Sequence, residues 1–501
     1  MPNSDAPAAR PATPIPARPA NAIPARPASA IPARPASAVP ARPAATLATA
    51  VRQLKRGSVL VVGDAMLDRY VYGRVSRVSP EAPVPVLAVE RELALPGGAG
   101  NVVRNLTALG AAVAFVSVVG DDQPGSDLTG LIGGQPRVEP WLLVQGGRAT
   151  TTKTRFVAAG QHLMRADHEQ AAPIHPRLAD RLVRIATDAV AATSVVVLSD
   201  YQKGVLSGDV APRIIAAARA AGRIVVVEPK GGDFARFAGA DLIVPEAHAL
   251  SLASGMPVDT LAELVIAATH LRRELQLGAV LVPHGPDGLT LVHGPLGGEC
   301  EALNLRAEAS DQHDPAGAGD AVVAVLAASL AAGLPLEVAA ELAAVAIGIV
   351  TRKAGIAVVR DDELLEALTP GLNAKRKLVS VPLASEMVER WRHRGWRIGL
   401  LHLGAGGGDA WTPQLMEQAR GWCDRLLVAV PDGAALCMAD WPAVDLLAEC
   451  HGQGNDELLR LFRPDILVHG PAAVPLGMDD ENLLAEWGGT LRRAELAQAA
   501  E

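Results

Sequence analysis

Val59-Leu-Val-Val-Gly-Asp64 is a short apolar run, rich in β-branched residues, that ends in a glycine and an aspartate. Such a run predicts a buried strand of a parallel sheet, because parallel strands are covered on both faces. Further runs of the same kind lie at 114–119, 195–198, 224–227, 242–244 and 280–282. Segments with helical periodicity, such as 177–192 and 210–221, separate them. This alternation predicts an α/β fold with a central, mostly parallel sheet between helices.

The segment 69–90 interrupts that order. It alternates apolar and polar residues and carries Pro80, Pro83 and Pro85. Proline within sheets is confined mainly to edge strands, because it cannot donate to the ladder. We therefore expect an excursion of edge strands from the main sheet.

The first 50 residues differ from the rest of the chain. The unit Ile/Val-Pro-Ala-Arg-Pro-Ala starts at residues 15, 23, 31 and 39. Regular prolines disfavour both helix and sheet, so residues 1–50 are predicted to be a disordered tail. Either the tail binds a proline-recognising or acidic partner, or it is a low-complexity extension with no fixed role.

The remainder divides into two predicted domains. Residues 51–372 contain the first α/β unit, and a basic cluster with a proline at 373–382 predicts a linker. Apolar runs at 398–401, 426–430 and 466–468 predict a second, smaller α/β domain over 383–501.

Composition excludes several classes of protein. The 501 residues carry a net charge of −8, which argues against nucleic acid as a partner. The four cysteines form no CxxC pair, so neither a zinc site nor a disulfide framework is expected. Apolar stretches fall short of the ~20 residues of a membrane span, and the first residues lack the apolar core of a signal peptide. We expect a soluble, cytoplasmic protein without a membrane partner.

The motif Asp314-Pro-Ala-Gly-Ala-Gly-Asp320 stands directly before a helical run at 321–330. Glycines before a helix let backbone amides point into a pocket, and the helix N-terminus adds positive potential. Such a nest suits a phosphoryl group in transfer. Asp320 can then accept a proton from a substrate hydroxyl, although an aspartate here is also a common helix cap.

A second glycine motif, Pro96-Gly-Gly-Ala-Gly-Asn101, precedes a helical run at 102–109. Its glycines permit close approach of backbone to a ligand, and Asn101 offers donors and an acceptor for sugar hydroxyls. The alternative is a glycine-rich turn in which Asn101 caps the helix. The motif is neither a dinucleotide fingerprint nor a Walker A loop.

Together the two motifs resemble the signatures of the ribokinase-like (PfkB) family of sugar kinases. The stretches 59–70, 76–86 and 198–204 are similar to its D-glycero-β-D-manno-heptose 7-phosphate kinase branch, and the resemblance covers about 54–368. It implies a ribokinase-like sandwich with a β lid, ATP and Mg²⁺ as cofactors, and a homodimer. It also implies phosphorylation of the sugar phosphate at C1, within ADP-heptose biosynthesis.

The same resemblance implies roles for individual residues. Asp320 is the expected general base, beside an anion hole formed by Gly317, Ala318 and Gly319. The expected sugar-binding positions are Asp64, Gly97, Gly98 and Asn101. The substrate phosphate is assigned to the cations Lys153, Arg155 and Arg165, which are otherwise surface basic residues.

The nucleotide site is expected at Gly285-Pro-Asp-Gly288 and at Lys203, although the first is also an ordinary hairpin turn and the second a possible helix cap. The family has Asn-x-x-Glu after the strand at 242–244, which helps to organise Mg²⁺ and the ATP phosphates. Here the four residues are Glu246-Ala-His-Ala249. Glu246 is an oxygen ligand of suitable hardness for Mg²⁺, or alternatively a charge that weakens nucleotide binding.

The C-terminal part resembles the adenylyltransferase domain that is often fused to this kinase, at 397–404, 414–430 and 461–470. The expected His-x-Gly-His motif is replaced, and its histidine positions fall on about Asp409 and Thr412. A carboxylate there opposes the negative charge of nucleotidyl transfer. We expect a degenerate, Rossmann-like nucleotidyltransferase domain without activity. The alternatives are a fully bifunctional enzyme and a catalytically weak scaffold that binds sugar phosphate.

Overall fold

The structure is a computed structural model. It describes residues 42–158, 161–285, 288–295, 298–307, 317–351, 353, 356, 358–369, 377–392, 396–404, 410–431, 436–450, 452–471, 473–477 and 479–494. The predicted tail therefore lies largely outside the described residues.

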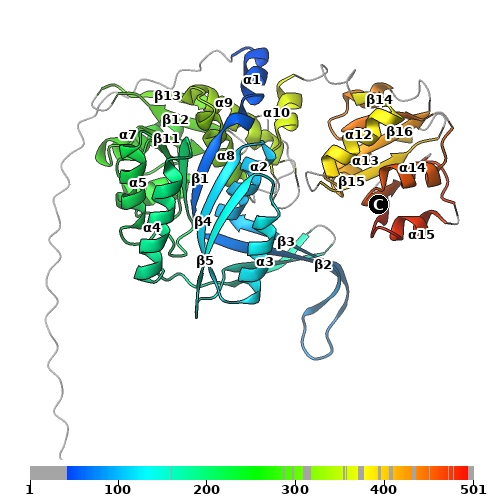
Figure 1. The fold of residues 1–501 in the computed structure, drawn as a ribbon, viewed down its shortest axis with the longest axis horizontal. Helices are drawn as coiled ribbons and strands as arrows, with labels where there is room; N and C mark the ends of the chain where they lie inside the picture. The colour runs from blue at the N-terminus through cyan, green and yellow to red at the C-terminus, as the bar shows by residue number, and fades with distance from the viewer. Residues whose placement is uncertain are drawn as a thin grey trace, which may run out of the picture. The chain divides into compact units, whose positions relative to one another are not determined.

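A nine-stranded sheet forms the centre of the first domain (Figure 1). Its order is β13-β12-β11-β10-β9-β8-β1-β4-β5, and β12 and β13 are the strands that run antiparallel to their neighbours. The strands are β1 (Ser58–Gly63), β4 (Ala112–Gly120), β5 (Val138–Gln145), β8 (Val195–Asp200), β9 (Ile224–Pro229), β10 (Leu242–Ile243), β11 (Ala279–Pro283), β12 (Leu289–His293) and β13 (Glu301–Leu305). Each apolar run predicted from the sequence is one of these strands.

Two layers of helices cover the sheet, and β1 shows why. Val59 and Val61 point into one core, whereas Leu60 and Val62 point into the other. The first core is covered by α1 (Ala44–Val51), α2 (Ala99–Ala108), α3 (Gln123–Gly133), α8 (Ala318–Ala331), α9 (Leu336–Val350) and α10 (Asp361–Leu368). The second is covered by α4 (Pro176–Val190), α5 (Val210–Ala220), α6 (Ala247–Ser254) and α7 (Leu261–Glu274). The predicted α/β sandwich is confirmed.

A separate four-stranded sheet forms the lid, in the order β3-β2-β6-β7. Its strands are β2 (Ala65–Val78), β3 (Pro85–Gly98), β6 (Thr152–Ala158) and β7 (Gln161–His168). The hairpin of β2 and β3 extends away from the main sheet in Figure 1. The predicted excursion of edge strands is this hairpin.

The structured part begins earlier than the sequence predicted. Helix α1 starts at Ala44, directly after Pro43, and it buries Leu47 and Val51 in the first core. The boundary at residue 50 was set by composition, but the repeat of prolines ends at Pro43 and the alanine-rich sequence after it favours a helix. The first domain therefore begins inside the predicted tail.

The second domain contains a parallel six-stranded sheet in the order β14-β17-β16-β15-β18-β19. Its strands are β14 (Leu378–Ser380), β15 (Ile398–His402), β16 (Arg425–Pro431), β17 (Leu446–Cys450), β18 (Ile466–His469) and β19 (Thr490–Arg493). Its helices are α12 (Val381–Arg392), α13 (Pro413–Arg420), α14 (Asn455–Phe462) and α15 (Asp480–Ala485). Because β14 is part of this sheet, the domain begins within the segment predicted as a linker.

Within the described ranges, no helix combines the length and apolar character that a bilayer crossing requires. The apolar run after Asp320 belongs to α8, which has 14 residues and is buried in the first core.

Candidate active site

The centre of the site is Asp320, in the first turn of α8 and 5% exposed. Tyr201 Oη donates a hydrogen bond to its Oδ1 at 2.6 Å. Asn101 Nδ2 donates to its Oδ2 at 2.7 Å. The N-cap of α8 is Gly317, so the carboxylate is not used to cap its own helix. Three segments that are far apart in the sequence thus meet at one buried carboxylate.

Opposing electrostatic effects act on Asp320. Burial and the nearby carboxylate of Glu228 raise its pKa to about 7, while the hydrogen bonds from Tyr201 and Asn101 and the charge of Lys230 act to lower it. A carboxylate that titrates near neutral pH accepts a proton more readily than an ordinary aspartate does. The position therefore suits a general base.

The predicted anion hole lies at the start of α8. Gly317 has a φ of +84°, and a Cβ there would stand 2.9 Å from Asn101 Nδ2. A Cβ on Gly319 would stand 3.3 Å from Glu228 Oε1. Ala318 is the first residue of the helix, whose N-terminus favours anions. Residues 314–316 of the motif lie outside the described residues, so binding of the phosphoryl group by this turn stays a prediction.

The second glycine motif is packed against two aspartates. A Cβ on Gly97 would lie 1.7 Å from Asp68 Oδ2, and one on Gly98 would lie 2.6 Å from the Asp64 carbonyl oxygen. Gly98 is the N-cap of α2, so Asn101 in the first turn does not cap this helix. Glycine is favoured at 97 and 98 because the end of β3 lies so close to Asp68 and to the backbone of Asp64.

Asp64, predicted to bind sugar, is 1% exposed and holds the loop after β8. Its carboxylate accepts backbone N–H groups from Tyr201 at 2.9 Å, Lys203 at 2.9 Å and Val205 at 3.0 Å. These bonds fix the backbone of the residue whose hydroxyl reaches Asp320. Contact between Asp64 and a sugar stays a prediction.

The three predicted phosphate-binding cations lie on the lid strands β6 and β7. Arg155 pairs with the buried Asp68, and Arg165 Nε lies 2.9 Å from Asp167 Oδ1. Lys153 Nζ lies 2.9 Å from the other oxygen of Asp167. Each cation therefore has a carboxylate partner in this structure.

Lys203 joins this cluster of cations. Its Nζ lies 2.9 Å from Glu169 Oε2, and Lys153 Nζ lies 3.3 Å from the same oxygen. The sequence assigned Lys203 to the nucleotide, but the structure groups it with a residue assigned to the substrate phosphate. Two lysines that share one carboxylate oxygen form a strongly cationic place for an incoming phosphate.

Glu246, which was predicted to lie at the nucleotide site, precedes α6, and its Oε1 lies 2.6 Å from Lys230 Nζ. Lys230 Nζ also lies 3.4 Å from Glu228 Oε1 and 5.2 Å from the centre of the Tyr201 ring. Burial alone would lower the pKa of Lys230, but the two carboxylates raise it above its ordinary value. The lysine is therefore charged and links Glu246 to the surroundings of Asp320.

The donors for Mg²⁺ can be judged from this cluster. Glu228 Oε1 is buried and accepts no hydrogen bond, and Glu246 offers a second carboxylate across Lys230. Mg²⁺ usually binds through one or two carboxylates together with substrate phosphates and water, so these residues fit it. In the part of the chain that the structure describes, no group of three or more His, Cys, Asp or Glu is arranged to hold a metal.

Gly285 and Gly288 lie at the turn between β11 and β12. Both have positive φ, +66° and +111°, and His284 N donates to the Gly288 carbonyl at 2.8 Å. This is ordinary hairpin geometry. Binding of the nucleotide by this turn stays a prediction. Pro286 and Asp287 lie outside the described residues.

Three residues of the site were not singled out from the sequence: Tyr201, Glu228 and Lys230. All three stand at or just after the carboxyl ends of the parallel strands β8 and β9. Ligands of open α/β sheets bind at that edge, so the position of these residues after predicted strands was an available signal.

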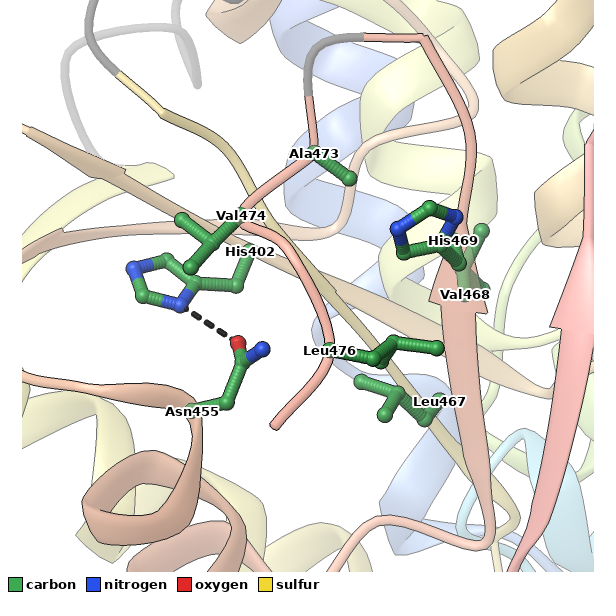
Figure 2. A pocket seen from close by; sticks show the side chains of 8 residues that line it. All are labelled: His402, Asn455, Leu467, Val468, His469, Ala473, Val474 and Leu476. Carbon is green, nitrogen blue, oxygen red and sulfur yellow. Dashed lines mark hydrogen bonds between the residues drawn. The ribbon is translucent and has the colours of Figure 1, made fainter. Parts of the chain in front are cut away.

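The second domain has a recess at the carboxyl ends of β15 and β18, where the strand order reverses (Figure 2). His402 Nδ1 and Asn455 Oδ1 lie 2.8 Å apart there, and burial lowers the pKa of His402. The recess has an empty volume of about 160 Å³ that includes open solvent, and its lining residues leave essentially no room for a water molecule. Thr412 Oγ1 caps α13 through Leu415 N at 3.3 Å, and Asp409 lies outside the described residues.

Comparisons with known proteins identify the family of this chain. The pattern of the pfkB family carbohydrate kinases matches residues 56–361. A protein named Bifunctional protein HldE from Acidiphilium cryptum is 50% identical over 471 residues, covering 90% of this chain and 95% of that protein. One of the same name from Paramagnetospirillum magneticum is 41% identical and covers 90% and 96%.

Solved structures support the fold alone. Ribokinase from Arabidopsis thaliana, complexed with ribose and ATP, has a TM-score of 0.50 at 21% identity, covering 62% of this chain and 99% of its own. The tetrameric inhibited form of phosphofructokinase-2 from Escherichia coli has a TM-score of 0.51 at 17% identity, covering 62% and 98%. The first domain has the ribokinase-like fold, and the chain belongs to the pfkB family of carbohydrate kinases.

Proposed function

We propose that the first domain transfers the γ-phosphoryl group of ATP to the C1 hydroxyl of D-glycero-β-D-manno-heptose 7-phosphate. The product is the 1,7-bisphosphate, a precursor in ADP-heptose biosynthesis. The observation that carries this proposal is Asp320, a buried carboxylate that two hydrogen bonds orient in the first turn of α8. Full-length similarity to bifunctional HldE proteins supports the choice of substrate class.

In the proposed reaction, Asp320 accepts the proton of the C1 hydroxyl as its oxygen attacks the γ-phosphorus. The new O–P bond forms as the bond to the β-phosphate oxygen breaks, and ADP leaves. The amides at Gly317, Ala318 and Gly319 face the group in transfer, where the N-terminus of α8 stabilises its negative charge.

The 7-phosphate end of the substrate is assigned to the lid. Lys153, Lys203, Arg155 and Arg165 provide the cations, and the carboxylates that now pair with them hold these side chains in place. A phosphate that replaces Glu169 between Lys153 and Lys203 gains two charge-assisted hydrogen bonds. In this proposal the lid, together with the loop after β8 that carries Lys203, selects a phosphorylated sugar.

Glu228 and Glu246 are the residues that would hold Mg²⁺ beside the nucleotide. When bound, the ion neutralises charge on the ATP phosphates. Lys230 separates the two carboxylates and supplies a protein cation in the same place.

A homodimer in the cytoplasm is part of the proposal. The lid carries exposed apolar side chains, among them Val78 at 64% and Met164 at 57%, which a second copy would cover. Size-exclusion chromatography with light scattering tests this, and a monomer at micromolar concentration contradicts it.

The function is tested by mass spectrometry of products from purified protein with Mg-ATP and the heptose 7-phosphate. We expect heptose 1,7-bisphosphate from the wild type and at least about a thousandfold less from Asp320→Asn, since the base is lost. Equal product from this variant would overturn the role of Asp320. Ligand-dependent thermal stabilisation without any ADP release would instead favour a binding scaffold.

The phosphate assignment has its own test. Lys203→Ala should raise KM for the heptose 7-phosphate about tenfold while leaving KM for ATP unchanged, because one charged hydrogen bond to phosphate is lost. Lys55→Ala, on the short turn before β1, is the matched control. A larger effect on ATP would return Lys203 to the nucleotide site.

A second activity, transfer of AMP to heptose 1-phosphate, is favoured by the full-length match to proteins named bifunctional. The small recess in the second domain and the threonine at position 412 argue against it. Incubation of the protein with heptose 1-phosphate and ATP decides the matter. ADP-heptose formed would establish the bifunctional alternative, and no product supports a domain without this activity.

A further inference from the structure

We propose that Tyr201 is a positioning residue of the kinase site, whose hydroxyl holds the Asp320 carboxylate in the orientation and charge state that accept a proton. The inference rests on the proposed role of Asp320 as the base. Tyr201 Oη lies 2.6 Å from Asp320 Oδ1, on the opposite oxygen from the bond made by Asn101. The two donors together fix the plane of the carboxylate.

The backbone of Tyr201 is itself fixed. Asp64, buried at the end of β1, accepts the N–H groups of residues 201, 203 and 205, which follow β8. Asp64 thus ties the loop to the adjacent strand and leaves the phenol directed at α8. Because Asp64 fixes the backbone of the loop, the hydrogen bond to Asp320 Oδ1 depends on the side chain at position 201.

The groups that face Asp320 come from several elements. Glu228 at the end of β9 opposes ionisation of Asp320, whereas Lys230 just after that strand favours it. Asn101 on α2 is neutral and donates one hydrogen bond. Tyr201 is therefore the donor at Asp320 Oδ1 that stabilises the ionised carboxylate, whereas Glu228 destabilises it.

Two further charged residues, Arg104 and Asp68, affect Asp320 indirectly, through Asn101 and Tyr201. Arg104 Nη1 donates to Asn101 Oδ1 at 3.0 Å, which orients the amide with its nitrogen toward Asp320. The carboxylate of Asp68 on β2 adds negative charge near Tyr201. Neither residue bonds to Asp320 itself in the described part of the chain.

The phenol keeps its proton across the working pH range. Burial, together with the charges of Asp320 and Glu228, raises the pKa of Tyr201 well above 10. The hydroxyl is accordingly a donor whenever Asp320 is ionised. A donor stabilises the ionised carboxylate, so its removal should make Asp320 take up a proton at higher pH.

The test compares the pH dependence of kcat/KM in the full-length wild type and Tyr201→Phe, with ADP measured in quenched reactions. The acidic limb should move up by about one pH unit, as expected for one lost hydrogen bond to a charged group. Activity at pH 6 should then fall about tenfold more than activity at pH 8.5. Tyr72→Phe, which keeps its ring over Arg91 in the lid, should retain the wild-type limb.

A second variant keeps the proposal falsifiable if Tyr201→Phe does not fold. Replacement of Tyr201 by 3-fluorotyrosine strengthens the donor at nearly constant size and should move the limb to lower pH. An unchanged limb in either variant, with Asp320→Asn inactive, overturns the role of Tyr201 and leaves the kinase intact. Full activity of Asp320→Asn overturns the proposed base instead.

Discussion

Lys230 Nζ lies 2.6 Å from Glu246 Oε1, the residue that stands where the resemblance expects the asparagine of Asn-x-x-Glu. The same lysine reaches Glu228, so the substituted position is connected to the neighbourhood of the base. Glu246 is thus part of a charge cluster in which its negative charge is matched by a cation. The departure from the family motif adds a charge at the proposed nucleotide site and leaves Asp320, the proposed base, with both of its hydrogen-bond donors.

Glu246→Asn should raise KM for Mg-ATP about fivefold with kcat unchanged within about twofold. The substitution removes a carboxylate that is proposed to hold Mg²⁺ beside the triphosphate, and one such charge interaction is worth about 1 kcal/mol in a solvated site. Steady-state kinetics with ATP as the varied substrate measure the change. Glu274→Gln, at an exposed position on α7, should leave KM unchanged. A lower KM in Glu246→Asn would mean that Glu246 repels the nucleotide and does not hold Mg²⁺.

Glu228→Gln should move the acidic limb of kcat/KM to lower pH. The charge of Glu228 raises the pKa of Asp320, which lies at about 7, and its neutralisation lets Asp320 ionise more readily. The pH profile of kcat/KM measures the shift, with Glu139→Gln on the edge strand β5 as the control. A limb that moves to higher pH would show that another group sets it.

The fold was predictable because its elements are locally encoded. The run at 59–62 is apolar at every position, and the structure buries its alternate residues in two different cores. The boundary of the tail was less predictable, since composition cannot say where a helix begins after the last proline. Helix α1 is stabilised by burial of Leu47 and Val51, a tertiary effect that lies outside any local pattern.

The sequence predicted the motif residues of the site, but it did not predict the hydrogen bonds that connect them to the rest of the site. Asp320 and Asn101 were both singled out, but their direct hydrogen bond joins positions 219 residues apart in the sequence. Tyr201 lies in the stretch 198–204 that resembles the kinase branch, but the sequence assigns it no role. Only the anchoring of its loop by Asp64 directs it to the base.

Asp64→Ala should lower the free energy of unfolding by about 3 kcal/mol or more. Three backbone N–H groups would lose their acceptor in a buried place, at about 1–3 kcal/mol for each group left unsatisfied. Urea denaturation followed by circular dichroism measures the loss. Asp188→Asn, exposed on α4, is the control. A change of less than about 0.5 kcal/mol, as is usual for a surface substitution, would contradict the anchoring role of Asp64.

Asp320→Asn should gain thermal stability relative to wild type as pH rises from 5 to 8. Burial and the charge of Glu228 raise the pKa of Asp320 to about 7 in the folded chain, above the ordinary value of 3.8, so between these values the folded state binds more protons than the unfolded state. Wild-type stability therefore falls with rising pH over that window, and the amide variant lacks this loss. Differential scanning fluorimetry at both pH values gives the difference in Tm between the two proteins. A difference that is the same at pH 5 and pH 8 would show that the pKa of Asp320 is not raised.

Gly97→Ala should impair the site, whereas Gly130→Ala should not. A methyl group on Gly97 would overlap the carboxylate of Asp68, since the two atoms would be 1.7 Å apart. Asp68 would have to leave its buried pairing with Arg155, which disturbs the lid strand β6 that carries two of the proposed phosphate-binding cations. We expect a Tm several degrees lower and a higher KM for the sugar phosphate, because overpacking typically costs about 1–3 kcal/mol.

Gly130 is the matched control because it lies in α3 with no atom within 4 Å of an added Cβ. Its φ is not in the left-handed region, so alanine there should raise the unfolding free energy by about 0.5–1 kcal/mol with normal kinetics. Equal effects of the two substitutions on KM would mean that the Asp68–Arg155 pair does not support the substrate site. A normal KM with a lowered Tm in Gly97→Ala would confine the role of this close approach to folding.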